Sequence, residues 1–181
     1  MTLPNILTWL RVILIPVLIV IWMIPSPETG LIAAAVFGLA SITDWLDGWL
    51  ARRWQMESRF GAFLDPVADK LMVSAALVLL VDAFDSLWVT LPAIVIIGRE
   101  IVVSALREWM SEIGERAQVA VSWLGKVKTA SQMIAIILCL ALPVEITMSH
   151  VGLWVLGLAA VLTLWSMWAY LRAAWPHLSA E

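Results

Sequence analysis

The chain has 181 residues, of which 62% are hydrophobic and only 14% are charged, and its net charge is −3. A soluble domain is closer to half apolar and a quarter charged, and one small core cannot bury this apolar excess. We therefore expect a membrane protein with one domain over residues 1–181, and no nucleic-acid partner.

Six segments approach the ~20 apolar residues that a bilayer-spanning helix needs. In chain order they are 7–24, 31–50, 61–81, 87–109, 121–142 and 151–171. The first contains Arg11 and is followed by no small-residue cleavage site, so it predicts a retained helix rather than a signal peptide. The pattern predicts an all-α polytopic protein with six transmembrane helices.

The charges of the connecting segments predict the orientation of these helices. The breaks at 25–30, 82–86 and 143–150 contain Glu28, Asp82, Asp85 and Glu145 but no Lys or Arg. The basic residues lie at the opposite helix ends, and Lys and Arg favour cytoplasmic loops. Both termini are therefore expected in the cytoplasm. Tryptophans near both expected boundaries are typical of interfacial anchors.

Polar and small residues form two stripes where the second segment ends and the third begins. The stripes are Asp44, Asp47, Gly48 and Ala51, and then Gly61, Asp65 and Asp69. Residues three or four apart share a helix face, so two adjacent helices can present four carboxylates to each other. The residues without bulky side chains leave room for a large group such as a nucleotide.

Four close carboxylates repel one another and stay partly protonated unless cations neutralise them. Oxygen-only ligands suit Mg²⁺, Mn²⁺ or Ca²⁺. A pair of such ions ~3.5–4 Å apart can clamp the attacking and leaving oxygens of a phosphoryl displacement. The pattern therefore predicts a two-metal phosphotransfer site with Mg²⁺ or Mn²⁺.

Two other interpretations compete with this one. The carboxylates can instead pair with Arg52, Arg59 and Lys70 in buried salt bridges, and Pro66 can kink the third helix and break its stripe. A cation transporter can also use intramembrane acids, but it needs a polar path through both faces. Here the four acids cluster near one face.

The string D-x-x-D-G-x-x-A-R, then eight residues, then G-x-x-x-D-x-x-x-D resembles the signature of the CDP-alcohol phosphotransferase family. Every defined position from 44 to 69 matches. The resemblance implies a dimeric six-helix membrane enzyme with two divalent metals on Asp44, Asp47, Asp65 and Asp69. It implies Asp69 as the base, and nucleotide contacts from Gly48, Ala51, Arg52 and Gly61.

Further strings are similar to those of the family's bacterial phosphatidylglycerophosphate synthases. They are P-N-I-L-T-W-L-R at 4–11, G-R-E at 98–100, L-R-E-W at 106–109 and G-K-V-K-T at 125–129. This likeness implies CDP-diacylglycerol as donor, sn-glycerol 3-phosphate as acceptor, and a place in the bacterial inner membrane with the site facing the cytoplasm. Another acceptor, such as inositol phosphate, remains an alternative.

Four basic residues of the fourth and fifth segments are candidates for binding the acceptor phosphate: Arg99, Arg107, Lys126 and Lys128. Arg offers bidentate phosphate contacts and Lys a point charge. For Arg107, Lys126 and Lys128 the alternative is that they bind anionic lipid headgroups. Arg99 lies ~15 Å from its helix end, so it must pair with Glu100 or face a polar cavity. Cys139, His150 and His177 are assigned no chemistry.

Overall fold

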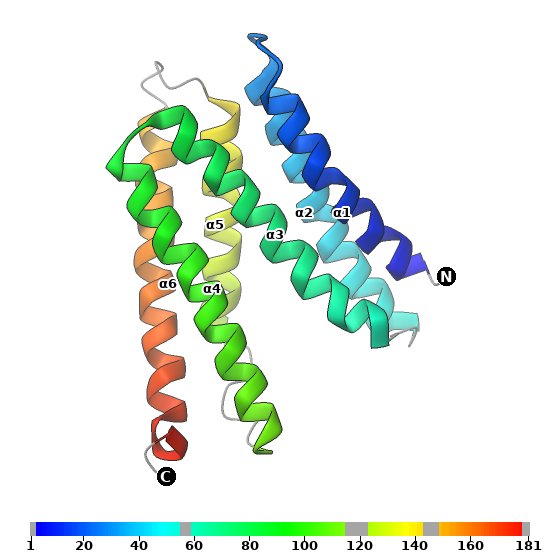
Figure 1. Cartoon of the computed structure of the whole chain (residues 1–181), viewed down its shortest axis with the longest axis vertical. Helices are drawn as coiled ribbons and strands as arrows, with labels where there is room; N and C mark the ends of the chain where they lie inside the picture. The colour runs from blue at the N-terminus through cyan, green and yellow to red at the C-terminus, as the bar shows by residue number, and fades with distance from the viewer. Residues whose placement is uncertain (1–2, 55–58, 115–122, 143–148, 179–181) are drawn as a thin grey trace.

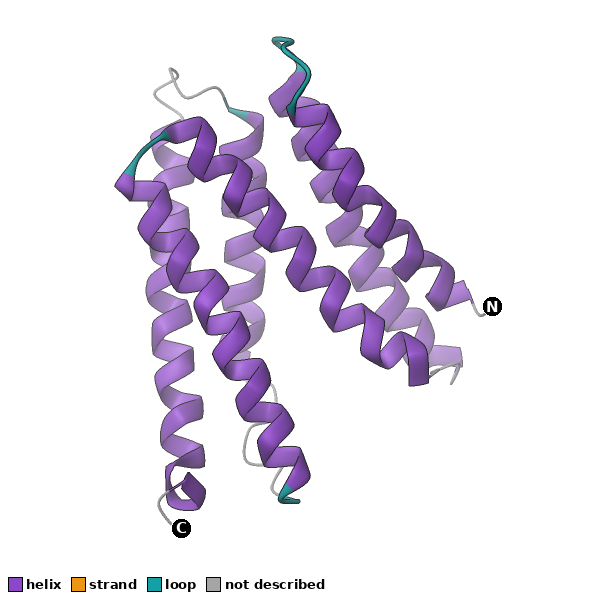
Figure 2. Ribbon diagram, in the orientation of Figure 1, coloured by secondary structure: helices purple, strands orange, loops and turns teal. Residues whose placement is uncertain are grey.

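The computed structural model describes residues 3–54, 59–114, 123–142 and 149–178. The helices are α1 (Leu3–Trp22), α2 (Thr29–Trp54), α3 (Arg59–Phe84), α4 (Leu87–Glu112), α5 (Trp123–Ala141) and α6 (Ser149–Leu178). Figure 2 shows only helices and connections in these ranges. The predicted six-helix, all-α fold is confirmed.

Helices α1, α2, α3, α4 and α6 are all longer than the apolar segments that predict them, and the largest extensions are in α2 and α6. Helix α2 continues to Trp54 and α6 to Leu178, past the expected ends at 50 and 171. The apolar pattern stops where charges begin, whereas the backbone hydrogen bonds of a helix continue through polar residues. Helix α3 runs as one element through Pro66, so this proline does not end the helix.

The turn between α3 and α4 has a defined capping geometry. Asp85 has a positive φ of 41°, which Asp tolerates better than most residues. Ser86 then caps α4, and its side chain accepts a hydrogen bond from the backbone N–H of Trp88. This N-cap satisfies one of the donors that a helix start leaves unpaired.

Successive helices alternate in direction, so the chain crosses the bundle six times (Figure 1). The connections from α1 to α2 and from α3 to α4 lie at the top of this view. The start of α1 and the end of α2 lie near mid-height on the right, and the ends of α4 and α6 lie at the bottom. The start of α1 and the end of α6 are thus both on the side of the bundle opposite to these two connections.

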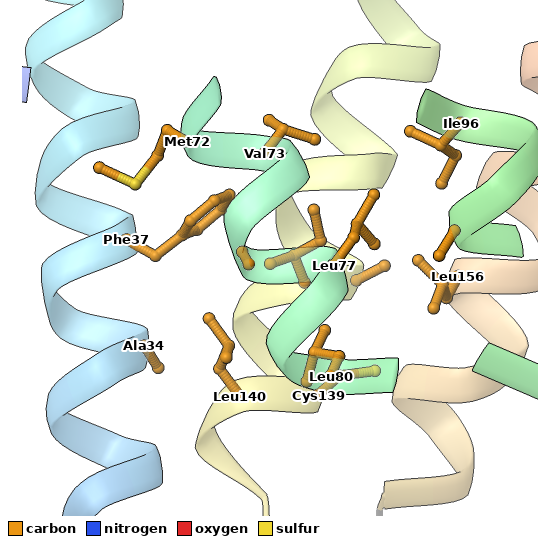
Figure 3. Packing of buried hydrophobic residues seen from close by; sticks show 14 of the residues in the cluster. Ala34, Phe37, Met72, Val73, Leu77, Leu80, Ile96, Cys139, Leu140 and Leu156 are labelled. Carbon is orange, nitrogen blue, oxygen red and sulfur yellow. The ribbon is translucent and has the colours of Figure 1, made fainter. Parts of the chain in front are cut away.

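Helix α3 lies at the centre of the bundle and contacts α1, α2, α4 and α5, while α6 packs against α4 and α5. The main core joins side chains from all six helices, and Figure 3 shows Phe37, Met72, Leu77 and Leu156 among them. The close approach of α2 to α5 requires a glycine at position 30. A Cβ at Gly30 would lie 2.5 Å from the carbonyl oxygen of Leu140, so α2 starts directly against α5.

The outside of the bundle is apolar. Helices α4 and α6 contain described stretches, Leu87–Glu112 and His150–Pro176, that are long and apolar enough to cross a membrane, with mean hydropathies of 1.9 and 1.8. Shorter apolar stretches lie in α1, α2 and α5. Trp88 near the start of α4 and Trp154 near the start of α6 are both about three-quarters exposed. Their ring centroids lie 6.3 Å apart. The number of spans and their orientation stay predictions.

Candidate functional site

Helix α1 contacts both of the helices that carry the motif aspartates. Arg11 is 1% exposed, and its Nη1 lies 2.7 Å from Oδ1 of Asp44 on α2. One turn earlier, the hydroxyl of Thr8 donates to Oδ1 of Asp65 on α3. Thr8 and Arg11 are three residues apart and share one face of α1. The structure thus brings α1, α2 and α3 together around carboxylates.

Asp69 lies one turn beyond Asp65 on α3. It is within electrostatic reach of Asp44 and Arg11, and also of Glu100 and Lys128 on α4 and α5. Asp44 in turn interacts with Asp65. We call Asp44, Asp65 and Asp69, with Thr8 and Arg11, the acid cluster.

The acid cluster brings together three of the four predicted metal ligands. Electrostatic interaction reaches farther than a metal–oxygen bond, and no three described acids, histidines or cysteines lie close enough to hold an ion as they stand. The side chain of Asp47 lies outside the described residues, as do those of Ala51 and Arg52 and the surroundings of Gly48. Gly61 is buried.

The donor chemistry of the acid cluster suits hard divalent cations. Its described donors are carboxylate oxygens, the ligands that Mg²⁺ and Mn²⁺ prefer. Three acids face one guanidinium within the cluster, so negative charge is in excess there. Added cations would relieve the repulsion among these acids.

A second set of polar side chains lies between α4, α5 and α6. Glu100 accepts from Nη1 of Arg99 at 2.9 Å and from Nζ of Lys128 at 2.5 Å. Nη2 of Arg99 donates to the hydroxyl of Ser166 at 3.0 Å. Arg99 and Lys128 are 8% and 2% exposed. The expected pairing of Arg99 with Glu100 is confirmed, and Lys128 joins it.

Tyr170 of α6 contacts both Arg99 and Arg107 of α4. Nη2 of Arg107 donates to the Tyr170 hydroxyl at 3.0 Å, and the guanidinium carbons of Arg107 and Arg99 lie 5.2 Å and 5.6 Å from the ring centre. Such distances are within cation–π range. We call Arg99, Arg107 and Lys128, with Glu100, Ser166 and Tyr170, the basic cluster.

Two buried N–H donors of the basic cluster have no acceptor among the described residues. The Nε atoms of Arg99 and Arg107 are buried and have no hydrogen-bond partner among the described residues. A buried donor without a partner is costly, so these atoms point to an anion that would accept from them. Lys126, the fourth candidate for the acceptor phosphate, has a side chain outside the described residues.

The salt-bridge interpretation of the aspartates fails for Lys70, which donates to the Ser104 hydroxyl in the described contacts. The side chains of Arg52 and Arg59 are outside the described part of the chain. Asp44 does form an ion pair, but with Arg11 of α1. Arg11 was not among the salt-bridge partners that the sequence suggested for the aspartates.

Sequence reasoning assigned no role to Thr8, Arg11, Ser166 or Tyr170, and it considered Glu100 only as a partner of Arg99. One signal was available, because an arginine inside an apolar segment marks a functional position by default. The i, i+4 spacing of Ser166 and Tyr170 carries no such signal, since hydroxyl-bearing side chains are common in membrane helices. Their partners are set only by how α6 packs on α4.

Comparison with known proteins adds an independent observation. A family model described as CDP-alcohol phosphatidyltransferase matches residues 1–165. The chain is 56% identical over 173 residues to the CDP-diacylglycerol–glycerol-3-phosphate 3-phosphatidyltransferase of Sodalis glossinidius, covering 94% of each chain. It is 54% identical over 171 residues to the protein of the same name from Salmonella choleraesuis, covering 94% of this chain and 93% of the relative. The similarity to the Shigella flexneri protein of that name has the same extent.

Proposed function

This chain belongs to the CDP-alcohol phosphatidyltransferase family, and we propose that it transfers the phosphatidyl group of CDP-diacylglycerol to sn-glycerol 3-phosphate. The products are phosphatidylglycerophosphate and CMP. The names of relatives that are more than half identical over nearly the whole chain support this reaction. They also favour an enzyme over a cation transporter.

The observation that carries the proposal is that Asp69, a member of the acid cluster, also interacts electrostatically with Glu100 and Lys128 of the basic cluster. A base that takes the proton of the acceptor hydroxyl must lie within hydrogen-bond reach of that hydroxyl, and the hydroxyl must lie beside the donor phosphorus. Asp69 interacts with groups of both clusters, and this suits it to that role. The hydroxyl oxygen then attacks the phosphorus bonded to the diacylglycerol, and the bond to the CMP oxygen breaks.

The donor headgroup would lie against α2 and α3. Asp44, Asp47, Asp65 and Asp69 would hold two divalent cations, Mg²⁺ or Mn²⁺, which when bound supply charge neutralisation for the pyrophosphate and the departing CMP. Gly48, Ala51, Arg52 and Gly61 would contact the nucleotide. Metal dependence is part of the proposal, and the carboxylate oxygens of the acid cluster support it.

The acceptor phosphate would bind at the basic cluster. The unpaired Nε donors of Arg99 and Arg107 support this position, because phosphate oxygens accept strongly from guanidinium groups. Glu100 forms ion pairs with Arg99 and Lys128 and so orients both side chains in a buried place. Lys126, two residues before Lys128 on α5, would add a fourth positive charge.

The cellular setting follows from charge and apolar surface. The basic ends of the helices would face the cytoplasm, as Lys and Arg do in bacterial membrane proteins, and the acyl chains of the donor would stay in the bilayer. All six helices would span the inner membrane. A homodimer is proposed from the family resemblance alone.

The test is a product assay with detergent-purified protein, CDP-diacylglycerol, Mg²⁺ and a panel of alcohols that includes glycerol 3-phosphate and inositol phosphate. The expected result is phosphatidylglycerophosphate, with one CMP released per lipid formed and no product after chelation of the metal. A faster reaction with inositol phosphate would reject the acceptor. Cation movement into vesicles without CMP release would reject the enzyme.

A further inference from the structure

Two contacts from α1 reach aspartates that stand on different helices. Arg11 binds Oδ1 of Asp44 on α2, and Thr8 donates to Oδ1 of Asp65 on α3. Both α1 residues are 1% exposed. Neither belongs to the aspartate motif, which begins at Asp44.

Each contact uses one oxygen of a carboxylate that has two. The named contacts engage Oδ1 of both aspartates, and a carboxylate held at one oxygen has a restricted rotation about its χ angles. The second oxygen is thereby aimed in a fixed direction. Carboxylates that ligate metals are commonly held in this way by outer partners, and loss of such a partner weakens metal binding.

We propose that Thr8 and Arg11 are positioning residues, which orient Asp65 and Asp44 for divalent cations. The inference rests on the metal site of the proposed function. Arg11 acts on Asp44 and Thr8 on Asp65, so one face of α1 sets the angle between carboxylates of two other helices. Neither residue touches the reacting atoms.

A purely structural role for the same contacts predicts another outcome. Helix α1 also packs through apolar residues such as Leu18, which belongs to the main core. If Thr8 and Arg11 only fasten α1 to the bundle, their loss lowers thermal stability and leaves the metal affinity of the folded protein unchanged. Metal affinity therefore separates the two roles.

The experiment measures Mn²⁺ binding to detergent-purified protein from the electron paramagnetic resonance signal of free Mn²⁺, without substrates. Thr8→Val removes the hydroxyl and keeps the shape, and we expect its Kd for Mn²⁺ to rise roughly 10- to 100-fold. Thr8→Ser restores the donor, so its Kd should lie close to that of the wild type. Arg11→Gln should weaken binding by a similar factor.

Thr163→Val is the matched control. Thr163 is fully buried in α6, and its hydroxyl has no hydrogen-bond partner among the described residues. Its replacement should leave Mn²⁺ binding unchanged. The Mg²⁺ concentration for half-maximal turnover should rise in Thr8→Val by the same factor as the Kd, with the KM for glycerol 3-phosphate unchanged.

The outcomes separate the inference from the proposed function. Wild-type binding of Mn²⁺ with an unchanged Kd in Thr8→Val overturns the inference and leaves the metal site standing. An equal loss of Mn²⁺ affinity in Thr163→Val also overturns the inference, because any loss of a buried hydroxyl would then weaken Mn²⁺ binding. A wild-type protein that binds no Mn²⁺ removes the metal site and the inference together. If Arg11→Gln does not fold, the comparison of Thr8→Val with Thr8→Ser decides whether the inference holds.

Discussion

The acid cluster and the basic cluster are built from the same kinds of residue in opposite proportion. In the first, three carboxylates face one arginine. The second contains two arginines and a lysine with one glutamate. An excess of acid suits cations and an excess of base suits an anion. The proposed function uses this difference, since a metal-complexed donor would bind at the first cluster and a doubly charged acceptor at the second.

The carboxylates of the acid cluster are also more exposed than Arg99 and Lys128 of the basic cluster. Asp44 is 40% exposed, whereas Arg99 and Lys128 are almost completely buried. A buried charge needs a partner, and Glu100 provides one in the absence of ligand. In the proposed function the acid cluster would need ions from solution, whereas Glu100 already orients Arg99 and Lys128 of the basic cluster. This difference leads to four predictions.

The largest effect is expected from the aspartates. Asp→Asn at 44, 47, 65 or 69 keeps size but removes a charge, and the loss of charge stabilisation should cost several kcal/mol, hence several orders of magnitude in kcat. Asp82→Asn is the control, because Asp82 is an exposed residue at the other end of α3. Near-normal turnover in two or more of the motif variants would contradict the role of the acid cluster.

A smaller and selective effect is expected from the basic cluster. Arg107→Gln removes a charged contact worth ~1.5–3 kcal/mol, so the KM for glycerol 3-phosphate should rise roughly ten- to a hundredfold. The KM for CDP-diacylglycerol should change much less, and Lys126→Gln should behave alike. Kinetics with each substrate varied in turn measure both constants.

Arg172→Gln is the control for this pair, since Arg172 is exposed on α6 and outside the basic cluster. Binding of lipid headgroups by Arg107 and Lys126 predicts a different result. Both substrates would then be affected alike, and added anionic lipid would change the size of the loss.

Tyr170→Phe should have a milder effect of the same kind. The variant loses the hydroxyl that accepts from Arg107 but keeps the ring that lies near both arginines. One hydrogen bond is worth ~0.5–1.5 kcal/mol, so the KM for glycerol 3-phosphate should rise by roughly two- to tenfold. A loss as large as that of Arg107→Gln would mean that the hydroxyl, and not the guanidinium, contacts the acceptor.

The last prediction concerns the side of the membrane that both clusters face, and it should leave activity unchanged. In a Cys139→Ser background, which removes the buried thiol, cysteines at the exposed positions Glu28 and Asp85 should react with an impermeant thiol reagent outside intact cells. A cysteine at exposed Ser111, at the basic end of α4, should react only after lysis. The reverse pattern would place both clusters outside the cell.

Much of the fold could be predicted from periodic apolarity, because each helix crosses an apolar medium and must satisfy its backbone internally. The helix ends were less predictable, as at Trp54 and Leu178, since charged residues continue a helix beyond the apolar window. Asp44, Asp65 and Asp69 were found from their spacing within and between adjacent segments. The pairing of Arg99 with Glu100 was open to prediction because the two are neighbours in the chain.

The sequence by itself determined the elements, the motif and the family, since these depend on local spacing and composition. Only the tertiary structure decided that Arg11 and Thr8 face the aspartates, and that Ser166 and Tyr170 hold the arginines of α4. These contacts join residues 33 or more positions apart. Their geometry depends on the rotation of each helix about its axis, and that rotation is set by the packing of all its neighbours at once.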